Sequence, residues 1–228
     1  MLLTSVSKSV AQLFSSPFRS VFWKSLGLTI ALLVGLWFGL EALVSGFLTP
    51  FMGPWPWVST AVSWLLGAGL VVGLGFLIAP VASVFAGVFL DDIAEAVEQR
   101  HYPDQPVGEP VSLVRSIGIT LRFLGLVLLG NLLALVTMLF FGFGVIVFFV
   151  VNGYLLGREY FQFAAMRHGS RDRAEDLRKH NGMTIFLGGL VIAALLSVPI
   201  LNLLTPLFAG ALMVHVHQYA TKRAGAAA

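Results

Sequence analysis

The chain has 228 residues, of which 57% are hydrophobic and only 11% are charged, whereas soluble domains carry roughly 25% charged residues. This composition indicates an all-α integral membrane protein that forms a single membrane domain over residues 1–228. The chain contains no cysteine, which excludes disulfides and thiolate metal sites. Its net charge of +3 is too small to indicate a nucleic-acid partner.

Residues 1–15 have the spacing of an amphipathic helix. Leu3, Val6 and Val10 fall on one helical face, and polar residues that include Lys8 fall on the opposite face. This pattern predicts an N-terminal helix that lies flat in the membrane interface.

A long apolar segment follows. Ser16 suits the cap of a helix and Pro17 suits its first turn, and the apolar run meets its first acid only at Glu41. Because about 20 residues cross a bilayer core, residues 17–45 are predicted to form a transmembrane helix.

A turn rich in proline, glycine and tryptophan leads to a second apolar run, and residues 58–79 are predicted to form a second transmembrane helix. Pro80 is expected to break or kink it. Residues 81–100 should continue as a helix that emerges into water, with its acids collected near the C-terminal end.

Two later apolar segments are each interrupted near the middle. The segment 112–157 contains FFGFG at 140–144, and the segment 181–220 contains VPILNLLTP at 198–206. Each is too long for one upright helix and marginal for two full spans. We therefore predict a helical hairpin in each segment, with a charged cytoplasmic helix at 158–180 between them.

The positions of the cations favour one topology. All fourteen Lys and Arg residues fall in four clusters separated by apolar segments, and six of them lie within 158–179. The four clusters share one compartment only if both hairpins enter the membrane and return, which is what the positive-inside rule favours. The predicted fold thus has two full transmembrane helices, two re-entrant, partially inserted helical hairpins and the N-terminal interfacial helix, with cytoplasmic termini.

Several segments resemble the CysZ family of bacterial sulfate permeases. The most specific are NGYLLGREYF at 152–161 and PILNLLTP at 199–206, and the similarity follows the same order along nearly the whole chain. The resemblance implies a multi-pass protein of the bacterial inner membrane that takes up sulfate for cysteine biosynthesis. It also implies assembly into dimers or higher homo-oligomers. No nucleotide-binding motif or metal-ligand cluster occurs, so we expect no enzymatic activity, no cofactor and no metal.

The resemblance further implies a sulfate-binding site at the start of the first transmembrane helix. The family has a short basic motif after a proline there, often with glycine and paired arginines, whereas this chain has a phenylalanine and one arginine. Unpaired N–H groups and the helix dipole also favour an anion at this end, and the arginine fork suits an oxyanion. The alternative is that the cations only contact lipid phosphates and set orientation. The matching residues are Ser16, Pro17, Phe18, Arg19, Ser20 and Lys24.

Six further polar residues lie in or beside the apolar segments, where polar groups are expected to line a pathway or to form ion pairs and helix contacts. The two arginines ahead of the long apolar run should either bind an anion, pair with Glu159 or an acid within 91–98, or extend to the membrane interface. An ion pair within the bundle is favoured for Arg158 and Glu159, and hydrogen bonds between helices are favoured for the two asparagines. The six residues are Arg115, Arg122, Asn131, Arg158, Glu159 and Asn202.

His215 and His217 lie two positions apart near the end of the second hairpin. Residues with this spacing do not face each other on a helix. The pattern therefore argues against a shared metal site and favours polar residues at the membrane interface.

Two functions of different classes fit these features. The first is a sulfate permease whose partners are the sulfate anion, the lipid bilayer and further copies of the chain. The alternative is a non-transporting, membrane-shaping or scaffold protein, because half-inserted hairpins and an interfacial helix would wedge one leaflet.

Overall fold

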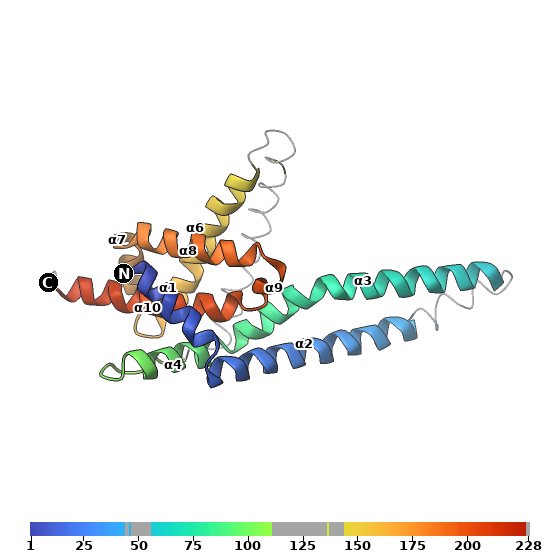
Figure 1. The fold of residues 1–228 in the computed structure, drawn as a ribbon, viewed down its shortest axis with the longest axis horizontal. Coiled ribbons are helices and arrows are strands. Elements are labelled where there is room, and N and C mark those ends of the chain that lie inside the picture. Colours follow the sequence, from blue (N-terminus) through green and yellow to red (C-terminus); the bar gives the residue numbers. More distant parts are fainter. Residues whose placement is uncertain (44–45, 47–55, 111–135, 137–143, 227–228) are drawn as a thin grey trace.

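The computed structural model describes residues 1–43, 46, 56–110, 136 and 144–226. All regular secondary structure in these ranges is helical (Figure 1), which confirms the all-α prediction. Two of the described helices are long and apolar enough to cross a bilayer, Ser16–Leu43 and Gly144–Met166.

The chain begins with helix α1 (Leu2–Leu13), and a short link leads to α2 (Ser16–Leu43). Helix α2 starts one residue earlier than expected, because the backbone N–H of Arg19 donates to the carbonyl oxygen of Ser15 at 3.0 Å. It coincides with the first predicted transmembrane helix.

Helix α1 packs on the protein with three polar residues together with the partly buried Leu2, Val6 and Leu13. Ser5, Ser9 and Gln12 are buried, whereas Leu3 and Phe14 are 84% and 77% exposed. The hydroxyl of Ser9 donates to the carbonyl oxygen of Ser5 at 2.9 Å, so the buried side partly satisfies its own polar groups. An outward apolar face is what a helix needs at a membrane interface, and the interfacial location stays a prediction.

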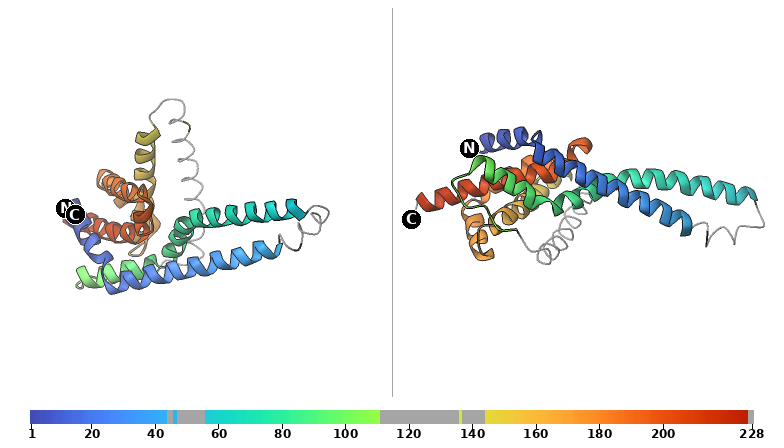
Figure 2. Two further views of the ribbon diagram at one scale, coloured as in Figure 1. Left: turned by 45° about the vertical axis from the view of Figure 1, so that its right-hand side comes forward. Right: turned by 90° about the horizontal axis from the view of Figure 1, so that it is seen from below.

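Helix α3 (Pro56–Val88) contains the second predicted transmembrane segment and runs beside α2. Of the two outcomes expected at Pro80, a break or a kink, the break is wrong, because α3 continues to Val88. Proline removes one backbone donor, and α3 accommodates it by changing direction in its C-terminal part rather than by ending (Figure 2). The break comes at Phe89, and α4 (Leu90–His101) follows with Asp91 and Asp92 in its first turn, where carboxylates favour a helix start.

Helix α6 (Gly144–Met166) crosses the predicted boundary between the first hairpin and the charged helix at 157/158, so that boundary is wrong. Gly157 does not end the helix. It allows contact with a neighbouring helix, because a Cβ atom there would lie 2.5 Å from the carbonyl oxygen of Ile185. The charged helix proper is α7 (Arg171–His180), whose start is capped by Ser170, which accepts from the N–H of Arg173.

The last part of the chain forms α8 (Gly182–Leu196), the single turn α9 (Pro199–Asn202) and α10 (Thr205–Ala226). The break predicted at 198–206 is therefore present, and α8 packs beside α10. The first hairpin's break at 140–144 lies almost wholly outside the described residues. Re-entrant insertion of either hairpin stays a prediction.

Helix α10 forms the centre of the protein. Helices α1, α4, α6 and α8 pack around it (Figures 1 and 2), and Phe208, Leu212 and Val216 are 0% exposed. We call this assembly the α10 core. Residues 30–43 of α2 and 56–78 of α3 extend away from it as a pair, which we call the α2–α3 arm (Figure 1).

Candidate functional site

The start of α2 carries the predicted anion-binding residues. Phe18 is 0% exposed and packs in the core, which fixes how α2 is rotated about its axis. Arg19, Ser20 and Lys24 are exposed as a consequence. Because the side chain of Phe18 points inward, this residue can offer an anion only its backbone N–H.

The predicted residues do not all share one face of α2. Ser16, Ser20 and Lys24 are spaced four apart and line one side of the helix, whereas Arg19 is five positions from Lys24 and lies on another side. The Nζ atom of Lys24 is 5.8 Å from the ring centroid of Phe89, a cation–π contact that directs it toward the α3–α4 junction. Arg19 is therefore the cation better placed to meet a ligand at the first turn.

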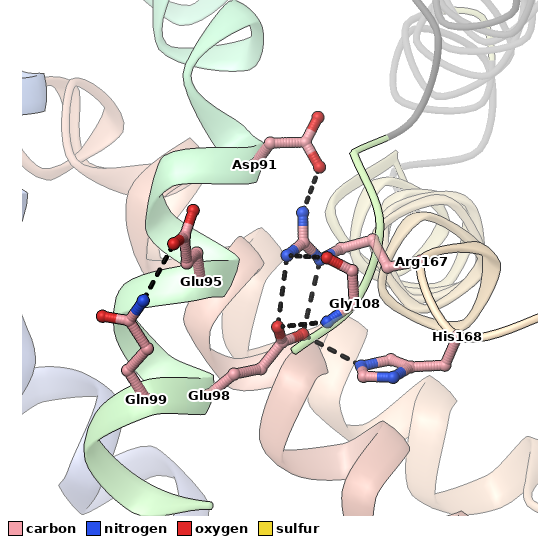
Figure 3. A network of polar contacts seen from close by, with 7 residues as sticks. All are labelled: Asp91, Glu95, Glu98, Gln99, Gly108, Arg167 and His168. Carbon is pink, nitrogen blue, oxygen red and sulfur yellow. Dashed lines mark hydrogen bonds and ion pairs between the residues drawn. The ribbon is translucent and has the colours of Figure 1, made fainter. Parts of the chain in front are cut away.

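A second group of charged residues is buried beside the α10 core (Figure 3). Arg167, one residue beyond the end of α6, is 3% exposed and forms ion pairs with Asp91 and Glu98 of α4. Its Nη2 atom lies 3.1 Å from Glu98 Oε2 and also donates to the carbonyl oxygen of Gly108 at 3.1 Å. The guanidinium thus joins α4, the loop after α4 and the end of α6.

Two more contacts complete this group. Nε2 of His168 lies 3.0 Å from Glu98 Oε1, and the backbone N–H of Gly108 donates to Glu98 Oε2 at 3.0 Å. A Cβ atom on Gly108 would lie 2.7 Å from Cβ of Arg167, so only glycine fits there. We call these residues the Arg167 clamp, and they are Asp91, Glu98, Gly108, Arg167 and His168.

The clamp keeps Glu98 ionised. Burial alone would raise the pKa of this carboxyl, but hydrogen bonds from His168, Arg167 and the Gly108 N–H outweigh burial and lower the pKa to about 2. Each polar group of the carboxylate has a partner, which is the condition under which a buried ion pair is tolerated. The arrangement is that of a structural lock rather than of a group that exchanges protons at neutral pH.

His215 and His217 are 2% and 4% exposed, so both are enclosed by the protein, and their location at the membrane interface stays a prediction. They point to different neighbours, as their spacing requires. Nδ1 of His215 lies 2.8 Å from the hydroxyl of Tyr102, and the ring of His217 stacks on that of His168 with centroids 5.0 Å apart. Among the described residues, no group of three or more His, Cys, Asp or Glu side chains has the arrangement of a metal site.

The predicted pathway residues are only partly described. Arg115, Arg122 and Asn131 lie outside the described residues. Nε of Arg158 and Oδ1 of Asn202 are enclosed without a hydrogen-bond partner, and the ion pair of Arg158 with Glu159 stays a prediction. The structure thus does not gather these six residues into one described site.

The arginine that α4 binds was not predicted. An acid within 91–98 was expected to pair with Arg115 or Arg122, and the described arginine in that role is Arg167, from the six-cation cluster. The available signal was the spacing of Asp91 and Glu98, which are seven apart and hence share a helix face.

The chain was compared with models of known protein families. A family model described as "Sulfate transporter CysZ/Etoposide-induced protein 2.4" matches residues 5–206. The matched range includes the start of α2 and all residues of the Arg167 clamp. A comparison with curated proteins found no match.

Proposed function

Because the chain belongs to the family of the sulfate transporter CysZ and etoposide-induced protein 2.4, we propose that it is a sulfate permease. It mediates sulfate uptake across the bacterial inner membrane for cysteine biosynthesis. The observation that carries the proposal is the family match over residues 5–206, together with an arginine exposed at the first turn of a helix long enough to span a bilayer. Membership in a transporter-type family is also consistent with the expectation that the protein is not an enzyme.

Sulfate is captured at the start of α2. The first-turn N–H groups have no partners within the helix, and the helix dipole adds roughly half a positive charge there. Arg19 adds a planar fork of donors that matches two oxygens of an oxyanion. The exposed hydroxyls of Ser16 and Ser20 flank the same turn, and the buried ring of Phe18 holds the helix in place.

Translocation then moves a dianion along a path between hairpins or between subunits of a homo-oligomer. Against a potential that is negative inside, this costs about 4.6 kcal/mol per 100 mV, from about 2.3 kcal/mol per charge. The sequence contains no nucleotide-binding motif, so the driving force comes from consumption of sulfate inside the cell, a steep gradient or a coupled ion.

Replacement of Arg19 tests the capture site. We expect Arg19→Ala to weaken sulfate binding by one to two orders of magnitude, because a charge-assisted hydrogen bond contributes about 1.5–3 kcal/mol. Calorimetric titration of the purified protein with sulfate measures the effect. Arg171→Ala is the matched control, since Arg171 is also an exposed arginine near the start of a helix. Equal sulfate affinity in both variants would remove Arg19 from the site.

One observation favours the scaffold alternative. Leu3 of α1 and Phe14, directly after it, are largely exposed, and apolar side chains inserted at the interface would wedge one leaflet. A scaffold of this kind binds and bends membranes but gives no sulfate flux.

A further inference from the structure

A buried imidazole, His215, and a partly exposed one, His101, meet where α4 packs against α10. The ring centroid of His215 lies 5.0 Å from that of His101, the last residue of α4. His215 is 2% exposed. The Nε2 atoms of both rings are enclosed and have no hydrogen-bond partner in the described part of the chain.

The contact with Tyr102 determines what His215 offers on its free side. The phenol hydroxyl lies 2.8 Å from Nδ1 of His215. When the phenol donates to Nδ1, the ring proton of a neutral imidazole lies on Nε2. His215 then presents an enclosed N–H donor without an acceptor, and a buried donor of this kind is destabilising until it gains an acceptor.

The charged groups around the two rings are basic. Lys8 lies on α1, which packs against α10, and Arg100 precedes His101 in the last turn of α4. Nζ of Lys222, on α10, lies 5.8 Å from the ring centroid of Tyr102. These positive charges repel a metal cation and attract an anion.

The carbonyl end of α4 also lies at this junction. Its partial negative charge offsets part of the positive potential, although Arg100 and His101 in its last turn compensate for it. The ligand that fits is therefore an anion with several acceptor oxygens, which can accept from an imidazole N–H and from an ammonium group at once.

We propose that Lys8, His101 and His215 bind a tetrahedral oxyanion, either free sulfate or phosphate or the phosphate of a lipid headgroup. The site is built by α1, α4 and α10 and is separate from the first turn of α2. It does not depend on the proposed transport function, since binding requires no translocation.

The test uses the full-length protein in detergent with Arg19→Ala as the background, so that the capture site on α2 no longer contributes. Calorimetric titration with inorganic sulfate and with phosphate should detect binding that falls about tenfold in Lys8→Gln and in His101→Gln, as expected for loss of one charge-assisted hydrogen bond. The affinity of His215→Gln for sulfate and phosphate should fall by at least the same factor. His180→Gln is the control, because His180 is an exposed histidine on α7 and should bind as the background does.

The two sources of the oxyanion are separated by a lipid measurement. Native mass spectrometry with added phosphatidic acid or phosphatidylcholine shows whether the anionic lipid is retained, and whether Lys8→Gln or His101→Gln abolishes that retention. Loss of sulfate binding supports a free anion, and selective loss of phosphatidic acid supports a headgroup. If neither ligand responds to either substitution, the proposal is wrong. If His215→Gln fails to fold, Lys8→Gln still decides, because Lys8 is exposed.

The two proposals fail in distinguishable ways. Sulfate affinity that is unchanged by Arg19→Ala but reduced by Lys8→Gln would contradict the capture site on α2 and leave the junction site standing. The opposite pattern would contradict the junction site alone.

Discussion

The α10 core and the α2–α3 arm differ in how far their apolar side chains are exposed. In the core, Leu212 and Val216 are 0% exposed, whereas in the arm Trp64 and Leu65 are 77% and 78% exposed. Large exposed apolar surface requires a non-aqueous environment. The comparison shows that the apolar side chains of the core are covered by other parts of the described chain, whereas those of the arm are not.

The core can be broken most severely at its clamp. Arg167→Met leaves two carboxylates of α4 without their counter-ion, and we expect a loss of about 3–5 kcal/mol in the free energy of unfolding. Thermal or denaturant unfolding in detergent measures it. Arg171→Met is the control on an exposed arginine and should change stability by less than about 0.5 kcal/mol. A loss for Arg167→Met as small as that of the control would show that the clamp does not stabilise the fold.

A matched pair of leucines tests the comparison itself. Leu212→Ala in the core should destabilise the protein by about 2–5 kcal/mol, because it leaves a cavity in packed surroundings. Leu65→Ala in the arm should cost less than about 1 kcal/mol in detergent, because its side chain packs against few protein atoms. Unfolding of both variants under one set of conditions gives the two values. Equal losses would mean that the arm is packed as tightly as the core.

Acid should act on the core through Glu98. The pKa of this carboxyl is about 2 in the folded protein and 4.5 ordinarily, so its ionised form stabilises the fold. That contribution, about 3 kcal/mol from about 1.4 kcal/mol per pKa unit, is present above about pH 4.5 and is lost as the pH falls toward about 2. The melting temperature measured from neutral to acidic pH should fall, and Glu98→Gln should flatten this dependence. An equal acid slope in the variant would assign the effect to other groups.

The helices themselves were largely predictable from apolar runs and breakers, and the helix ends were less so. In a sequence, a proline such as Pro80 is compatible with either a bend or a helix end. The packing of α3 decides between the two. Gly157 resembles a helix end in the sequence, whereas in the structure it allows the backbone of α8 to lie close to α6. The hydrophobic periodicity of a sequence does not show which helices, distant along the chain, pack against each other.

The buried polar groups were the least predictable part. Arg167 lies in a cluster of six cations for which a charged cytoplasmic helix was predicted, and its partner Glu98 is 69 positions away. His215 ends a hairpin arm in sequence but lies in the centre of the protein in space, since α10 is surrounded by other helices. The start of α2 was predictable, because Ser16 and Pro17 mark a helix start and Arg19 is the cation nearest to it.

The most direct test of the proposed function is sulfate flux into proteoliposomes. Radiolabelled sulfate should enter vesicles that contain the wild-type protein faster than empty vesicles, and Arg19→Ala should lower the initial rate at low sulfate concentration by at least tenfold, while Arg171→Ala retains it. Flux no greater than that of empty vesicles, from protein shown to be folded by its melting curve, would contradict the permease and favour the scaffold.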